Sequence, residues 1–291
     1  MVTACRKALA VAHFSALEAL GTPLSLLLAL AAAVSTLTLP LLQFQRFSED
    51  GRLARDCGFA TALLLGLFLA VAHVGRVRQA VRDGTAAMAF VKPLSRGLWL
   101  VGHFAGTLVA LGHFLVVQAL AVLTAEAASP RYHAGATGPD GRRLLLAFGA
   151  LAGALVMGAV WNRVRNGRFV RAANGLLVVA LLVPVVWGGD IHWGTLTIFP
   201  AGAMLLCQVA AVALPLTLHL GTGVAGALTG GLLVAMILFL HGAAYLPMDA
   251  LAQVHGGHVP TTTLLGLLPQ TLCVTAFLLC VSAASLNRHD I

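Results

Sequence analysis

Long apolar runs separated by short polar stretches make up most of this chain. A helix needs about 20 consecutive, mostly apolar residues to cross the hydrocarbon core of a bilayer. Eight segments come close to that length: residues 22–42, 58–75, 97–123, 143–161, 172–188, 201–219, 223–246 and 264–285. The pattern therefore predicts an all-α, polytopic membrane protein, with about eight transmembrane helices in a single domain that covers residues 1–291.

Two parts of this pattern need separate treatment. The sixth and seventh segments are divided only by a glycine-rich turn near Gly221 and Gly223, where no charge fixes the side of the membrane. A re-entrant pair is therefore an alternative, with six full spans. Residues 6–20 are only weakly apolar and begin with Arg6 and Lys7, so we expect a short helix in the membrane interface there.

Composition agrees with a membrane protein. Hydrophobic residues make up 59% of the chain and charged residues 10%, and the mean hydropathy is +0.92, whereas soluble domains average about 25% charged residues. The net charge is +8, but no basic tract is interleaved with aromatic residues as in nucleic-acid-binding proteins. We therefore expect membrane lipid, and no nucleic acid, around this chain.

The basic residues indicate how the spans are oriented, because cytoplasmic loops carry an excess of Lys and Arg. With eight alternating spans and a cytoplasmic N-terminus, both termini are cytoplasmic, and twelve of the eighteen basic residues fall inside against six outside. The inside set is Arg6, Lys7, Arg76, Arg78, Arg82, Lys92, Arg96, Arg163, Arg165, Arg168, Arg171 and Arg288; the outside set is Arg46, Arg52, Arg55, Arg131, Arg142 and Arg143.

Small residues recur at four-residue spacing in three of the apolar segments: Gly102 and Gly106, Gly149 and Gly153, Gly226 and Gly230. Such pairs let helices approach closely in lipid, where packing replaces the hydrophobic effect as the driving force. Packing within the bundle and a subunit interface both fit this spacing.

Histidines are the main candidates for chemistry. His255 and His258, with Asp249 nearby, are weak candidates for a metal site in an outer loop, since two imidazoles and one carboxylate form an incomplete ligand set. The alternative is that they are polar loop residues. Five more lie in or at the ends of spans and suit either a proton relay or hydrogen bonds between helices: His73, His103, His113, His219 and His241.

Several enzymatic motifs are missing from the sequence. There is no G-x-x-x-x-G-K-[ST], so the chain cannot bind a nucleotide through a P-loop of its own. H-E-x-x-H and G-x-S-x-G are also missing. Acidic residues are nearly lacking inside the spans, which argues against a proton- or sodium-coupled carrier.

The loop over residues 76–96 is the most basic part of the chain. Arg82 and Asp83 precede Gly84–Thr85, where Thr85 is a candidate helix cap. A short apolar run, 86–91, follows and ends at Lys92–Pro93, before Ser95–Arg96 leads into the next span. This predicts a short amphipathic helix on the membrane surface, or else a basic loop that only fixes topology.

This loop resembles the cytoplasmic loop of type-2 ATP-binding-cassette (ABC) exporter permeases, in particular the NosY-like branch. In that family an acidic residue and Gly-Thr are followed by a short apolar helix, then Lys-Pro-(Val)-Ser-Arg and a span that opens with glycines. The matching positions are Gly84, Thr85, Lys92, Pro93, Ser95, Arg96, Gly102 and Gly106. Two positions differ: Ala80 stands where the family has glutamate, and His103 where it has lysine. The resemblance is specific over about residues 47–106.

The resemblance implies the transmembrane subunit of an ATP-driven exporter in the bacterial cytoplasmic (inner) membrane. Such a subunit is no enzyme and holds no cofactor, pairs as a homodimer or heterodimer, and uses ATP bound by a separate ATPase subunit on the cytoplasmic side. The loop would be the coupling element, with Arg82, Asp83, Gly84, Thr85, Lys92, Pro93, Ser95 and Arg96 as its residues. The alternatives are an ATP-independent secondary transporter or channel and, more remotely, a membrane metalloenzyme.

Overall fold

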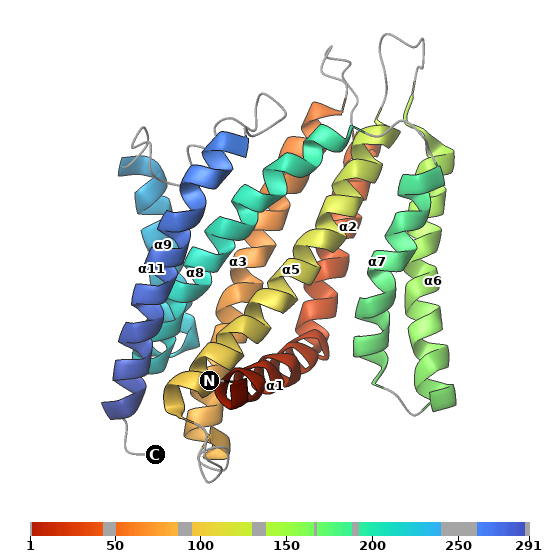
Figure 1. Cartoon of the computed structure of the whole chain (residues 1–291). Helices are drawn as coiled ribbons and strands as arrows, with labels where there is room; N and C mark the ends of the chain where they lie inside the picture. The colour runs from red at the N-terminus through yellow and green to blue at the C-terminus, as the bar shows by residue number, and fades with distance from the viewer. Residues whose placement is uncertain are drawn as a thin grey trace.

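The computed structural model describes residues 2–42, 51–86, 95–129, 138–165, 168–187, 192–239 and 261–288. These residues form nine α-helices and one 3₁₀ helix, with no strand among them (Figure 1). The helices are α1 (Val2–Leu20), α2 (Pro23–Leu42), α3 (Arg52–Arg82), α5 (Arg96–Ala128), α6 (Gly141–Arg165), α7 (Phe169–Trp187), η2 (Trp193–Thr197), α8 (Ile198–Leu220), α9 (Thr222–Phe239) and α11 (Thr261–Arg288).

Seven helices in the described ranges are long and apolar enough to cross a membrane, which confirms a multi-pass helical membrane protein. They are Pro23–Leu42, Arg52–Arg82, Arg96–Ala128, Gly141–Arg165, Phe169–Trp187, Trp193–Leu220 and Leu264–Leu286. They coincide with the first six and the last of the eight predicted segments. Helix α9 lies in the remaining one, 223–246, of which residues 240–246 lie outside the described residues.

From α2 onward, successive long helices run in alternating directions, so the start of α1 and the end of α11 lie at the same end of the bundle (Figure 1). We call this the basic end, because it carries eleven of the fifteen basic residues in the described ranges. The other four lie at the opposite end of the bundle: Arg52 and Arg55 near the start of α3, and Arg142 and Arg143 near the start of α6. This division matches the one that the loop pattern predicts.

Helix α5 lies at the centre of the fold, in contact with α1, α2, α3 and α8. Its Gln118 side chain is fully buried and donates from Nε2 to Thr36 Oγ1 of α2 at 2.5 Å and to the Gly58 carbonyl of α3 at 2.9 Å. A Cβ at Gly58 would lie 2.7 Å from Val122 Cγ2, so this close approach requires glycine. A buried amide thus joins three helices where close packing and hydrogen bonds stabilise contacts in lipid.

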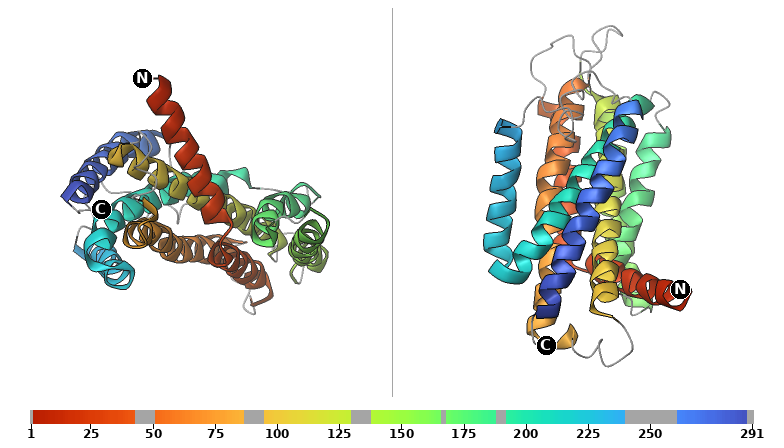
Figure 2. Two further views of the ribbon diagram at one scale, coloured as in Figure 1. Left: turned by 90° about the horizontal axis from the view of Figure 1, so that it is seen from below. Right: turned by 60° about the vertical axis from the view of Figure 1, so that its left-hand side comes forward.

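Helix α1 crosses the basic end at a steep angle to the other helices (Figures 1 and 2). It packs against α5, where a Cβ at Gly102 would lie 2.6 Å from Val11 Cγ1 and one at Gly106 2.5 Å from Ser15 Cβ. This glycine pair therefore serves packing within the chain. The helix begins at Val2, earlier than the predicted residue 6, and its position in the membrane interface stays a prediction.

Helices α6 and α7 form a pair at one edge of the bundle (Figure 1). They touch closely at Gly158, where a Cβ would lie 3.0 Å from the Ala173 Cβ. A buried amide joins α7 to the α1–α2 junction: Asn174 Nδ2 donates to the Leu20 carbonyl at 2.7 Å and to Ser25 Oγ at 2.9 Å. Elsewhere the pair exposes large apolar side chains, such as Leu145, Val179 and Val186.

Candidate functional site

The described members of the predicted coupling set lie at the basic end, where α3 ends and α5 begins: Arg82, Asp83, Gly84, Thr85, Ser95 and Arg96. Arg82 is the last residue of α3, and the Asp83 amide donates to the Gln79 carbonyl at 2.8 Å. Gly84 follows with φ +69°, a left-handed conformation that favours glycine and ends the helix. The side chains of Arg82, Asp83 and Thr85 are exposed, so this corner is open to a partner.

Thr85 is the candidate cap of a following helix, but residues 87–94, where that helix would continue, lie outside the described residues. Its hydroxyl donates to the Ala80 carbonyl at 3.0 Å, back onto the last turn of α3, while Thr85 itself already has helical geometry. The bond holds the Gly84 turn against α3. Ala80 therefore takes part in this turn through its backbone carbonyl.

Ser95 and Arg96 lie at the start of α5. Ser95 is the N-cap, and its Oγ accepts a hydrogen bond from the Leu98 amide at 3.3 Å. The Arg96 guanidinium donates from Nη1 to the Leu286 carbonyl of α11 at 3.4 Å. Lys92 and Pro93 lie outside the described residues, and so do His255 and His258.

A second arginine joins α3 to the turn between α8 and α9. Arg78 Nη1 donates to the Thr217 carbonyl at 3.2 Å. Gly221 has φ +94°, a left-handed conformation, so the turn favours glycine. Nearby, His219 Nε2 and Ser285 Oγ lie 2.6 Å apart and connect α8 to α11.

These side chains border a cavity of about 350 Å³ at the basic end, lined by Arg78, Val81, Arg82, Leu218 and His219. Arg82 belongs both to this cavity and to the predicted coupling residues. The sequence pattern did not assign Arg78, Thr217, His219 or Ser285 to a site at the basic end. Its one signal here was the turn at Gly221, which indicates that the chain reverses direction between α8 and α9.

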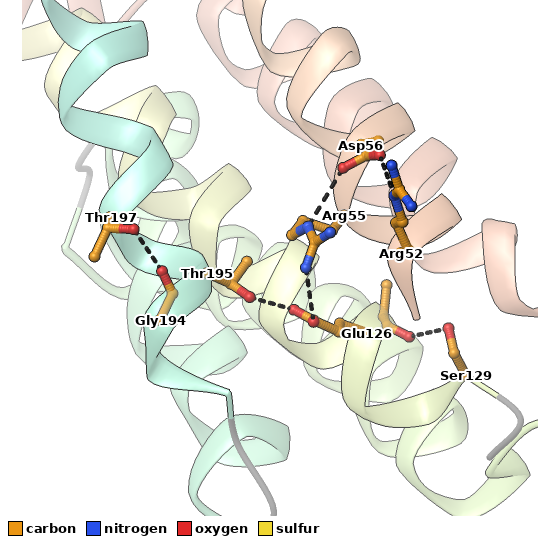
Figure 3. Close-up of polar contacts among 9 residues, drawn as sticks. Arg52, Arg55, Asp56, Glu126, Ser129, Gly194, Thr195 and Thr197 are labelled. Atoms are coloured by element: carbon orange, nitrogen blue, oxygen red, sulfur yellow. Dashed lines mark hydrogen bonds and ion pairs between the residues drawn. The ribbon is translucent and has the colours of Figure 1, made fainter. Parts of the chain in front are cut away.

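A different polar cluster lies at the opposite end of the bundle (Figure 3). The Glu126 carboxylate of α5 is 3.8 Å from Arg55 Nη1 of α3 and accepts a hydrogen bond from Thr195 Oγ1 of η2 at 2.6 Å. Its side chain is 7% exposed. Arg55 also contacts Asp56 at 3.3 Å. The cluster joins three elements, whereas the sequence placed Glu126 only near the end of a span.

The described histidines show no common metal site, since no group of three or more His, Cys, Asp or Glu residues in the described ranges is placed to hold an ion. His73 is buried, and neither ring nitrogen has a hydrogen-bond partner in the described part of the chain. The ring of His103 packs on Trp99, with centroids 4.5 Å apart. His73 and His103 thus lie in different surroundings, one buried without a hydrogen-bond partner among the described residues and the other against an aromatic ring.

The polar residues that stand out in this structure are therefore of two kinds: those that join helices, and the exposed group at the α3 corner. Comparisons with protein-family models, with curated proteins and with solved structures find no match for this chain.

Proposed function

We propose that this chain is the transmembrane subunit of an ATP-driven exporter and that a separate ATPase subunit binds at the basic end. The observation that carries the proposal is the way the α3–α5 corner is attached. Arg78 and Arg96, on either side of residues 82–95, donate hydrogen bonds to backbone carbonyls of α8 and α11. A force applied at this corner therefore acts on four helices.

The exposed residues of the corner suit contact with a protein. Arg82 and Asp83 offer opposite charges side by side, and both side chains are exposed. Charged groups at the rim of an interface steer association and select the partner. The left-handed conformation of Gly84 ends α3 at a defined position, so the chain leaves the helix in a defined direction.

The mechanism that follows is mechanical. When two ATPase subunits close on ATP, the corner is displaced, and α3, α5, α8 and α11 move together as a rigid group. The Gln118 bonds extend this group to α2 through Thr36. In this proposal the permease forms a dimer, the basic end faces the cytoplasm and the chain carries no cofactor, because ATP is bound by the partner.

Assembly with an ATPase tests this function. We expect the full chain, co-expressed with an ABC ATPase subunit encoded beside its gene, to co-purify with it from detergent and to raise its rate of ATP hydrolysis. An unrelated ABC ATPase serves as the control. The proposal would be contradicted if the chain failed to co-purify with the ATPase and transported a substrate across the membrane of vesicles that contain no ATPase. That result would favour an ATP-independent carrier.

A further inference from the structure

The outer face of the α6–α7 pair has an apolar groove of about 550 Å³. It is lined by Leu145, Leu146, Gly149, Ala150, Gly153, Ala154 and Met157 of α6 and by Leu176, Val179, Ala180 and Val183 of α7. Gly149 and Gly153 form its floor, and a Cβ at either position would meet nothing within 4 Å. Unlike Gly102 and Gly106, this glycine pair does not pack against another helix in the described part of the chain.

The groove continues toward the basic end along one face of α6. Gly153, Met157, Trp161 and Arg165 follow one another at four-residue spacing, which places them on one side of the helix. Val160, Trp161 and Val164 are exposed and extend the apolar face beyond the groove. Arg165 lies over the Trp161 ring, 5.5 Å from its centroid, so its charge is held at the end of this face.

The charge at this end is strongly one-sided. Arg163 and Arg165 end α6, Arg168 precedes α7, and all three side chains are exposed. The sequence has no acidic residue between Asp140 and Asp190. Arginines near a membrane surface attract anionic lipid, by a factor of about five for each, and their guanidinium geometry suits a phosphate.

The spacing fits a lipid that lies along the pair. Met157 is eight residues from Arg165, which is about 12 Å along the helix. The headgroup and interfacial region on each side of a bilayer is about 5–8 Å thick. A phosphate at Arg165 and Arg168 therefore allows the attached acyl chains to reach the groove at Met157 and to extend along Gly153 toward Gly149.

A second copy of the chain fits this face less well. If two copies met here about a two-fold axis along the membrane normal, the arginines of both α6–α7 pairs would gather at one end without an acidic partner on either pair. Like charges at short distance oppose such a contact. An anionic lipid relieves this repulsion between the arginines. The charge at this face therefore favours a lipid over a second copy of the chain.

We propose that the α6–α7 pair binds an anionic phospholipid from the leaflet at the basic end. Its phosphate contacts Arg165 and Arg168, and one acyl chain lies in the groove over Gly153. The site would add contacts along the edge where α6 and α7 have little protein around them. This inference does not depend on the proposed export function.

The test uses native mass spectrometry of the full chain in detergent, titrated with phosphatidylglycerol or with phosphatidylcholine of identical acyl chains. We expect phosphatidylglycerol to bind at least tenfold more tightly. Replacing Arg165 and Arg168 by Gln (R165Q/R168Q) should reduce this affinity about tenfold or more. The control R6Q/K7Q removes the same charge from exposed positions of α1 at the same end and should change it less than about twofold.

A groove variant separates the lipid from a second copy. Gly153→Leu places a branched side chain at the groove, and a Cβ at this position meets nothing within 4 Å. We expect it to weaken phosphatidylglycerol binding several-fold while the oligomeric state stays unchanged. Equal binding of both lipids, equal losses in R165Q/R168Q and R6Q/K7Q, or a Gly153→Leu variant that changes only the oligomeric state would each overturn the proposal.

Discussion

Alanine replacements at the α3–α5 corner are expected to separate binding of the ATPase from coupling to it. Arg82→Ala with Asp83→Ala should reduce co-purification with the ATPase about tenfold or more, because close charge pairs across an interface have coupling energies of about 1.5 kcal/mol or more. Both side chains are exposed at the end of α3, and neither is needed for the hydrogen bonds that end the helix.

Arg96→Ala is expected to act differently. Arg96 is half-buried, and its guanidinium donates to the Leu286 carbonyl of α11. Its loss should leave assembly within about threefold of the parent, equivalent to less than 1 kcal/mol, while stimulation of ATP hydrolysis falls more steeply. Arg142→Ala, an exposed arginine at the opposite end, is the control for both assays. If the Arg82/Asp83 double variant and Arg96→Ala both bind and stimulate the ATPase like the parent, these residues have no coupling role.

The second large effect is expected at Glu126. Removal of one partner from a buried ion pair costs about 3–5 kcal/mol. Glu126→Ala leaves Arg55 with its contact to Asp56, so we expect about 3 kcal/mol, at the lower end of that range. Thr195 also loses its hydrogen-bond acceptor at the start of η2–α8. Reversible denaturation in mixed micelles measures the change.

The matched control for Glu126 is Arg52→Ala. Arg52 pairs with Asp56 at 3.5 Å, and the two side chains are 35% and 25% exposed, so solvent screens the pair and its loss should cost less than about 1 kcal/mol. Glu126→Gln keeps an oxygen for Thr195 and should fall between the two. Equal losses in Glu126→Ala and Arg52→Ala would show that burial of the Arg55–Glu126 contact adds nothing to stability.

Hydropathy predicted the spans well because each one needs a long apolar run, and the structure has helices at those positions. It underestimated α3 and α5, of which α3 spans Arg52–Arg82 and α5 continues to Ala128. Polar residues at a helix end lower the local hydropathy while the backbone hydrogen bonds continue, so an apolar window stops too early. The glycine pairs illustrate a similar limit: Gly102–Gly106 packs on α1 and Gly149–Gly153 lies open, although their spacing is the same.

The hydrogen bonds and ion pairs that join the helices could not be predicted from the sequence, because they depend on how distant segments pack. Arg78 and Arg96 bind backbone carbonyls 139 and 190 residues away, and a carbonyl is present at every residue. Arg55 and Glu126 were visible as charges, but their pairing depends on how α3 and α5 pack. By contrast, the left-handed Gly84 and the Ser95 cap involve only local geometry, although the sequence pattern had placed the cap at Thr85.

Photo-cross-linking from Thr85 tests the central claim most directly. Thr85 is exposed at the corner beside Gly84, and replacing it by benzoylphenylalanine brings a reactive ketone to the proposed ATPase contact. In the co-expressed complex we expect a covalent adduct with the ATPase subunit from position 85 and none from position 142, at the opposite end of the bundle. An adduct from position 142 with none from position 85 would contradict the account.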